Sequence, residues 1–311
     1  NATDFNVMFI VFTSLQAFAG MWINAFIVCV LCIDWLKRKS CNSNEKILLF
    51  LGCSRFWHSC TICVFIVFLI TYPWCFSVQP IPQLFAAIRS FFDTSNVWAS
   101  ACLSVFYCIK IANFRNTFFI YLKVKIDRIV PWLLLGSVLL SLIMCILAYS
   151  INSVAALKLL NTTTPESLLK LSVRMDEHLF PLLFLTGFMS ATAFTAVVFS
   201  ALFLLFSLWR HKRKMQTKAV KDLSTDAHIK AIKIILSFLF LYSINFTRFI
   251  MSLIYVTKKE KLATVIVLIF KYALPVFHSL ILIFSNPKLE KTLLRTLCSW
   301  NILHCEKCKV C

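Results

Sequence analysis

The sequence predicts an all-α membrane protein, a seven-transmembrane helix bundle with its N-terminus extracellular and its C-terminus cytoplasmic. Three observations lead to this fold class. Seven long apolar stretches divide the chain, 60% of its 311 residues are hydrophobic with a mean hydropathy of +0.82, and basic residues gather beside alternate ends of the stretches. A single soluble core cannot enclose so much apolar surface, whereas a bilayer can accept it when the backbone is helical.

Each apolar stretch is long enough to cross roughly 30 Å of hydrocarbon as a helix. Arg89 and Asp93 interrupt the third near its outer end, so its apolar core is expected at 94–112. We expect a receptor domain over 1–284 and a short, mobile cytoplasmic tail with a cysteine cluster over 285–311. The predicted spans are about 8–33, 46–72, 84–112, 129–149, 179–208, 228–256 and 262–284.

Lysine and arginine define the predicted orientation. The connections 34–45, 113–128 and 209–227 and the tail carry 18 of the 32 basic residues, against six in the connections on the other side. The positive-inside rule therefore puts the first set in the cytoplasm. This topology explains the net charge of +19, because the basic residues lie in short loops beside the membrane. There they are also attracted to membrane lipid. Because no stretch alternates basic and aromatic residues, we exclude a nucleic-acid partner.

The longest connection, 150–178, is expected to be an extracellular loop. It contains no cysteine, so the disulfide that many receptors form between this loop and the third span is excluded. Its Asn161-Thr162-Thr163 sequon is a candidate glycosylation site that the glycosylation machinery can reach.

The tail contains cysteines in CxxCxxC spacing. A zinc or iron–sulfur centre needs a complete ligand set in a settled fold, so we expect no metal and no cofactor there. S-palmitoylation beside the membrane is the preferred reading, and an incidental cysteine tail is the alternative. The palmitoylation candidates are Cys298, Cys305, Cys308 and Cys311.

Three runs carry a family resemblance. Residues 103–114 read LSVFYCIKIANF, residues 228–242 read HIKAIKIILSFLFLY and residues 278–289 read HSLILIFSNPKL. In this order they resemble the LSxFYxxKIANF, HxxAxKxxxSFLxLY and HSxILIxxNxKLK runs of the type 2 (bitter) taste receptors, a family of G-protein-coupled receptors. The Asp-Arg-Tyr, Cys-Trp-x-Pro and Asn-Pro-x-x-Tyr signatures of rhodopsin-like receptors are missing. Arg115, where the family commonly has Ser, and Cys102, where many members have Asn, depart from the pattern.

The resemblance implies a bitter taste receptor in the plasma membrane. Such a receptor would bind small, mostly hydrophobic bitter compounds in a helix-bundle cavity that faces the outside and would activate a gustducin-like, Gi-class heterotrimeric G protein. A vomeronasal-type pheromone receptor is the alternative within signalling. A seven-span transporter or channel, the alternative from another class, would need broken spans, paired intramembrane charges or an internal repeat, and none is evident in the sequence. The absence of a catalytic motif argues against an enzyme.

Polar residues inside the spans need partners, because an ionisable group in the membrane is costly. Arg55 lies deep in the second span, and Asn24 and Ser279 lie at similar depth in the first and seventh. We predict that these three form a polar knot, with His58 on the same helix face as Arg55. The knot is either a fixed scaffold or a switch. The set of structural or switch residues is Asn24, Arg55, Tyr242, His278 and Ser279.

Lys271 lies in the middle of the seventh span, two helical turns before His278 and on the same face. Three interpretations remain open: it is solvated in a wet cavity, it pairs with backbone carbonyls as a neutral amine, or it attracts anionic or carbonyl-bearing ligands. We favour exposure to the cavity.

The rest of the ligand site follows from the resemblance and from helix periodicity. Trp98 matches a tryptophan on which family ligands stack, and Tyr242 matches a residue proposed as a rotamer switch. The predicted ligand-binding residues are Trp98, Ala101, Cys102, Phe184, Phe188, Tyr242, Asn245, Phe246, Phe249, Leu268, Lys271 and Tyr272.

The resemblance also implies a G-protein surface at the inner ends of the third, fifth and sixth spans. Snorkelling to the interface is the alternative for each lysine in it. The residues assigned to this surface are Tyr107, Lys110, Arg115, Lys123, Lys125, His211, Lys214, His228, Lys230 and Lys233.

Overall fold

A computed structural model describes residues 2–72, 74–75, 78–112, 117–160, 168–215 and 261–308, with further positions between 236 and 250. Side chains are described within 10–157, 181–210, 236–250 and 273–298. All regular structure in these parts is helical and none is strand, which confirms the all-α prediction for them. The helices are α1 (Ala2–Arg38), α2 (Ser43–Thr71), α3 (Ile81–Ile111), α4 (Thr117–Leu160), α5 (Leu168–Met215), α7 (Lys261–Ser285) and α8 (Pro287–Cys308).

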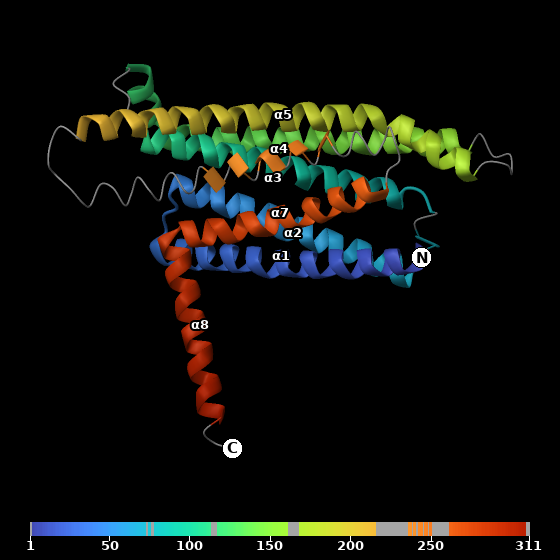
Figure 1. Ribbon diagram of the computed structural model, residues 1–311, viewed down its shortest axis with the longest axis horizontal. Helices are drawn as coiled ribbons and strands as arrows, with labels where there is room; N and C mark the ends of the chain where they lie inside the picture. The colour runs from blue at the N-terminus through green and yellow to red at the C-terminus, as the bar shows by residue number, and fades with distance from the viewer. Residues whose placement is uncertain are drawn as a thin grey trace.

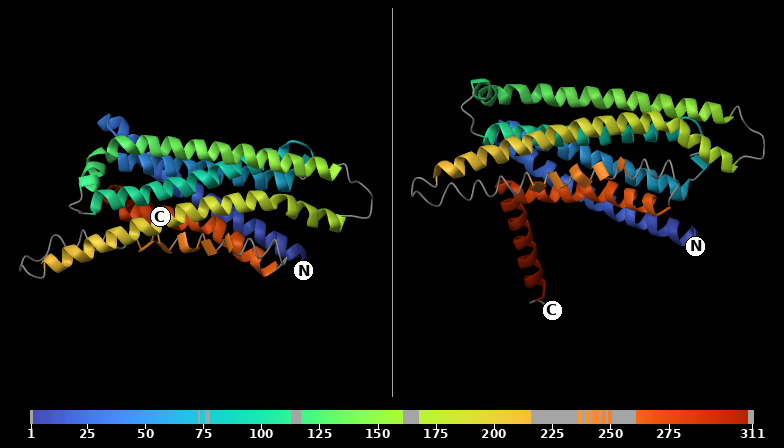
Figure 2. Two further views of the ribbon diagram at one scale, coloured as in Figure 1. Left: turned by 90° about the horizontal axis from the view of Figure 1, so that it is seen from above. Right: turned by 45° about the horizontal axis from the view of Figure 1, so that its top comes forward.

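The helices α1–α5 and α7 run side by side as one elongated bundle, and α8 leaves it at a steep angle (Figure 1). α3 packs against α2, α4 and α5, while α1 packs against α2 and α7; the views in Figure 2 show the same layers from two further directions. The N-terminus and the start of α8 lie at opposite ends of the bundle, as an odd number of crossings requires. The end at which α8 begins is called the α8 end below.

The outer surface of the bundle is apolar. Leu15, Trp22, Trp132 and Ile146 are all more than half exposed, and their helices α1 and α4 face outward there. Within the described residues, four segments are long and apolar enough to span a membrane: Ile10–Arg38, Ser43–Thr71, Phe119–Leu157 and Pro181–Ser207. Their exposed side chains fit contact with lipid, because water-soluble proteins rarely expose apolar patches of this extent.

The loop expected over 150–178 is mostly helix, which corrects the sequence-based boundary. α4 continues to Leu160 and α5 already begins at Leu168. The polar residues past the predicted end of the fourth span bond to their own helix: Asn152 donates to the Ala148 carbonyl at 2.7 Å and Ser153 to the Tyr149 carbonyl at 2.8 Å. Such side-chain bonds let a helix continue through polar sequence. α3 likewise runs unbroken through Arg89 and Asp93.

The tail expected to be mobile forms α8 instead. Asn286 Oδ1 accepts a hydrogen bond from the Lys288 backbone N–H at 3.1 Å, and Pro287 occupies the first helical position. An Asn cap followed by Pro is a strong helix-start signal. Leu289, in the first turn of α8, is fully buried in the core cluster. The capping sequence and the burial of Leu289 explain why this segment is helical.

Candidate functional site

A hydrogen-bond network around Arg55 joins three helices near the middle of the bundle. Arg55 on α2 is only 3% exposed. Its Nη1 donates to Ser279 Oγ on α7 at 2.9 Å, and its Nη2 lies 3.2 Å from Ser100 Oγ on α3 and 2.5 Å from His278 Nδ1 on α7. The guanidinium thus links α2, α3 and α7 through neutral acceptors.

Asn24 extends the network to α1. Its Oδ1 accepts a hydrogen bond from Ser279 Oγ at 2.8 Å, and its Nδ2 donates to the Gly20 carbonyl at 2.7 Å. The three residues that depth counting predicted to meet, Asn24, Arg55 and Ser279, therefore do meet. Their role as scaffold or switch stays a prediction.

The network also fixes the tautomer of His278. A guanidinium can only donate hydrogen bonds, so His278 Nδ1 must accept. The ring is then neutral and carries its proton on Nε2. Neither His278 nor Ser100 was predicted to contact Arg55. The neighbouring position of His278 and Ser279 in the sequence could have indicated the first contact, whereas Ser100 is one of several serines along α3.

His58 has a different partner from the one its helix face suggested. Its Nε2 lies 3.2 Å from Asp93 Oδ1 on α3, which connects α2 to α3 at a second level. From the sequence, Asp93 was expected only as an interruption near the outer end of the third span. Because Asp93 belongs to an unbroken α3, its carboxylate reaches the α2 face that carries His58.

Tyr242 connects the sixth predicted span to α3. Its hydroxyl donates to the Val97 carbonyl at 2.7 Å, and its side chain is buried. The next residue on α3 is Trp98, whose indole N–H is buried with no hydrogen-bond partner among the described residues. Ala101 and Cys102 are buried one turn further along. The hydroxyl of Tyr242 thus contacts the α3 backbone next to Trp98, and these are the two ligand-site residues taken from the resemblance.

Aromatic contacts hold α5 against the sixth predicted span. Phe194 and Phe246 stack with ring centroids 5.5 Å apart and planes 11° from parallel. The Phe249 ring occupies the space that a Cβ on Gly187 would need, so only glycine permits this close approach. The contact therefore runs through Gly187 and Phe194, a face that the sequence analysis did not single out.

Phe184 and Phe188 lie on the same part of α5 as Gly187, and their side chains are 65% and 60% exposed. Their assignment to the ligand site stays a prediction. Four other predicted positions fall outside what the structure describes: Asn245 entirely, and the side chains of Leu268, Lys271 and Tyr272 on α7.

The predicted G-protein surface is partly described. Lys110 forms an ion pair with Asp127 at 2.8 Å, Lys123 donates to the Ala112 carbonyl at 3.3 Å, and Lys125 lies 4.5 Å from the centroid of the Tyr121 ring. Tyr107 packs against the core cluster. Arg115, His228, Lys230 and Lys233, together with the side chains of His211 and Lys214, lie outside the described residues.

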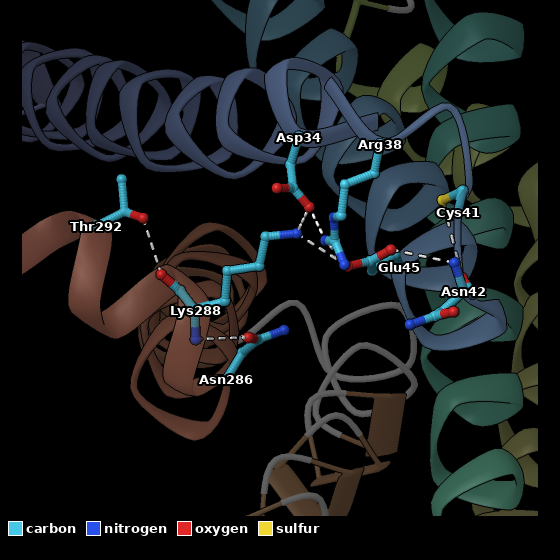
Figure 3. Close-up of polar contacts among 8 residues, drawn as sticks. All are labelled: Asp34, Arg38, Cys41, Asn42, Glu45, Asn286, Lys288 and Thr292. Carbon is cyan, nitrogen blue, oxygen red and sulfur yellow. Dashed lines mark hydrogen bonds and ion pairs between the residues drawn. The ribbon is translucent and has the colours of Figure 1, made fainter. Parts of the chain in front are cut away.

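Four charged residues at the α8 end form an ionic cluster that the sequence analysis missed (Figure 3). Lys288 on α8 pairs with Asp34 on α1 and with Glu45 on α2, and Arg38 pairs with the same two carboxylates; the Glu45 pairs are 2.9 Å long. Glu45 also accepts the Asn42 backbone N–H at 3.1 Å, at the start of α2. We call Asp34, Arg38, Glu45 and Lys288 the ionic cluster.

The modification candidates are described only in part. Cys298 is exposed on α8. Cys305 and Cys308 lie on the same helix, and their side chains are outside the described residues, as are Cys311 and Asn161 altogether.

The model of the taste receptor protein (TAS2R) family matches residues 2–301. The chain belongs to the type 2 taste receptor family. It is 32% identical to the taste receptor type 2 member 9 of Papio hamadryas over 304 residues, which cover 93% of each chain. The member 9 receptor of Homo sapiens is 33% identical over 295 residues, with 93% of each chain covered. The member 8 receptor of Gorilla gorilla gorilla is 33% identical over 303 residues, covering 93% of this chain and 95% of that one.

The family confirms the resemblance drawn from the three sequence runs. The chain is a bitter taste receptor, a multi-pass protein of the plasma membrane with a G-protein-coupled receptor fold, and its family is one of receptors rather than of enzymes. The structure also gives two of the runs a physical meaning. In this taste receptor, the run at 278–289 supplies the acceptors for Arg55, the cap of α8 and the lysine of the ionic cluster. The run at 103–114 contains Lys110, which forms the ion pair with Asp127.

Proposed function

We propose that this taste receptor binds small, mostly hydrophobic bitter compounds beside Trp98 and Tyr242, and that binding activates a gustducin-like, Gi-class G protein. The observation that supports this most strongly is the hydrogen bond from Tyr242 to the Val97 carbonyl. It joins the sixth predicted span to the turn of α3 that carries Trp98. A compound that stacks on Trp98 therefore acts on the backbone that holds the sixth span in place.

The chemistry of this region favours breadth of recognition. Trp98 offers a large apolar surface and one buried N–H without a partner, while Ala101 and Cys102 add small buried side chains. Apolar sites with few directed polar groups accept diverse hydrophobic ligands at moderate affinity. The indole N–H would favour agonists that place a hydrogen-bond acceptor beside the ring.

Activation would follow from a shift in population between two arrangements of the sixth span. An agonist shifts this equilibrium only by the difference between its affinities for the two arrangements. In the closed arrangement Tyr242 bonds to Val97; in the open one the bond is broken, and the inner ends of the third, fifth and sixth spans part to admit the C-terminal helix of the Gα subunit. The basic side chains assigned to this surface would then face the G protein, with Lys110 first released from Asp127.

We propose that Lys271 faces the ligand cavity.

The decisive experiment for the proposed function and for Lys271 measures calcium responses of cells that express the receptor with a gustducin-tailed promiscuous Gα, using neutral, cationic and carboxylate bitter compounds. We expect ligand-dependent responses, and we expect Lys271→Met to weaken responses to carboxylates at least tenfold while leaving neutral agonists unchanged. Unchanged potency for every agonist would remove Lys271 from the site. Complete silence of a receptor detected at the surface would contradict the proposed agonist class.

We further propose glycosylation of Asn161 and palmitoylation of the α8 cysteines. The exposure of Cys298 on a helix that leaves the bundle beside α1 supports the second modification. A glycosidase-sensitive mobility shift that Asn161→Gln abolishes would support glycosylation of Asn161. Radiolabelled palmitate incorporation should fall when Cys298, Cys305, Cys308 and Cys311 are replaced by Ser, and an unlabelled parent receptor would refute it.

A further inference from the structure

Arg55 is a buried cation without an acidic partner. All of its polar contacts go to neutral groups, namely Ser279, Ser100 and His278. No carboxylate in the described part of the chain pairs with it, and the carboxylate of Asp93 lies against His58 instead. An uncompensated buried charge is costly in a medium of low dielectric constant, and neutral acceptors only reduce this cost.

A small polar cavity lies on the other side of the same guanidinium. It lies between α1, α2 and α7 and has room for one small particle, such as a water molecule or a monatomic ion. Gln16, Asn24, Arg55, His58 and Ser59 supply its polar wall, and Ile62 and Pro275 are among the apolar residues that close it.

Arg55, which lines this cavity, keeps one donor that no described residue accepts. Its two Nη groups are engaged with α3 and α7, whereas its Nε is buried and has no hydrogen-bond partner among the described residues. The side chain is 3% exposed, so this donor cannot reach bulk water. Ser59 adds a hydroxyl to the wall, and the amide of Gln16, whose oxygen is also without a partner, can present its N–H₂ group instead.

We propose that this cavity binds one small monovalent anion, chloride, as the counter-ion of Arg55. The guanidinium N–H and the amide N–H₂ can only donate and the Ser59 hydroxyl can also donate, which suits an anion better than a metal cation. The small volume favours a monatomic ion over carboxylates and phosphates. Because the cavity lies between α1, α2 and α7, the bound ion would stabilise the packing of these three helices.

The test uses the purified full-length receptor and inorganic salts. Thermal unfolding is followed by loss of the monomer peak in sodium chloride, sodium bromide or sodium gluconate at one ionic strength. Gluconate serves as the reference anion because it is too large for the cavity. We expect a saturable rise in Tm of about 2 °C or more in the two halides relative to gluconate. Equal Tm values in all three salts would mean that water occupies the cavity and would overturn the proposal.

Two glycine variants separate a bound ion from a general effect of salt. A Cβ on Gly20 would meet Ser59 Oγ at 2.8 Å, inside the cavity, so Gly20→Ala should abolish the halide effect without removing any contact of Arg55. Gly52→Ala is the matched control, because its Cβ would meet Val28 and Ile27 at 3.2 and 3.3 Å, away from the cavity; it should keep the effect. A halide effect that survives in Gly20→Ala would overturn the proposal.

A second measurement covers the case in which Gly20→Ala does not fold. Crystals of the wild-type receptor grown in sodium bromide should show an anomalous-scattering peak beside Arg55 Nε. Absence of the peak at a bromide concentration that saturates the Tm effect would assign that effect to another site and refute the proposal.

Discussion

The two sides of this bundle differ in the polar contacts that join their helices. On the side formed by α1, α2 and α7, directed hydrogen bonds and ion pairs add to a buried apolar core, from the Arg55 network to the ionic cluster. On the side formed by α5 and the sixth predicted span, the described contacts are aromatic, such as the Phe194–Phe246 stack and the Phe249 ring over Gly187. α3 touches both sides, through Ser100 and through Val97.

This difference separates a fixed frame from a side that can rearrange. A hydrogen-bond network buried in a membrane has few alternative arrangements, because each broken bond leaves a polar group without a partner. Stacked aromatic rings can slide over one another at little cost. The contrast supports the proposal that activation moves the sixth span against an unmoved α1–α2–α7 frame.

The largest effect is expected from Arg55→Leu. The change removes the donor that serves Ser279, Ser100 and His278 and leaves these buried groups partly unsatisfied, which should cost about 2–4 kcal/mol of stability. Surface expression and the Tm of the purified receptor measure this loss. Arg55→Lys, which keeps the charge but not the forked geometry, should give a smaller loss. Normal surface level and signalling of Arg55→Leu would show that the frame does not depend on the network.

Gly187→Ala tests the aromatic side. The added methyl group would occupy the position of the Phe249 ring, so this ring or the helix that carries it must move, at a cost of about 1–3 kcal/mol. We expect a changed agonist concentration–response curve with near-normal surface expression. Gly136→Ala is the control, because nothing lies within 4 Å of its added Cβ. Identical behaviour of the two variants would contradict the close packing at Gly187.

Tyr242→Phe tests the junction between the two sides. It removes only the hydroxyl that bonds to Val97, so the closed arrangement should lose about 1 kcal/mol, equivalent to roughly a fivefold shift in population. Signalling without agonist should rise accordingly. The measurement compares basal calcium or G-protein activation at matched surface levels. A drop in basal activity would mean that the bond stabilises the active arrangement instead.

The smallest effect is expected from the ionic cluster. Glu45 and Lys288 are partly exposed, and such pairs contribute about 0–1 kcal/mol and weaken with salt. A double-mutant cycle with Glu45→Gln and Lys288→Met should give a coupling energy in this range that falls between 50 mM and 500 mM salt. A coupling energy above about 2 kcal/mol, insensitive to salt, would identify the cluster as a buried network.

The sequence was most informative where depth could be counted along a helix. Asn24, Arg55 and Ser279 were expected together because a membrane span has fixed length per residue, so equal distances from the cytoplasmic ends mean equal depth. The same counting failed for Asp93, because the depth of a residue does not say which neighbouring helix its side chain faces. His58 was therefore not identified as its neighbour. Gly187 was missed because the only trace of a close approach between helices in the sequence is a glycine. A glycine by itself does not say which neighbour packs against it.

Charge patterns were read less well than apolar ones. Lys110 was weighed between G-protein contact and snorkelling, and its partner Asp127 was not considered because it lies 17 residues away on the next helix. The ionic cluster joins residues up to 254 positions apart in the sequence, Asp34 and Lys288, which no local pattern indicates. α8 was a local feature that the Asn286-Pro287 start could have indicated.

The attachment of α8 has a consequence for anyone who builds an optical sensor from this receptor. Lys288 ties the first turn of α8 to α1 and α2, so a fluorescent protein fused at the C-terminal end of α8 would move with the frame. A second fluorophore on the N-terminal end of α2 would hold nearly the same distance to it with and without agonist. To obtain a signal, one partner must be inserted into the sequence between the fifth and sixth spans, and the C-terminal fusion then serves as the stationary reference.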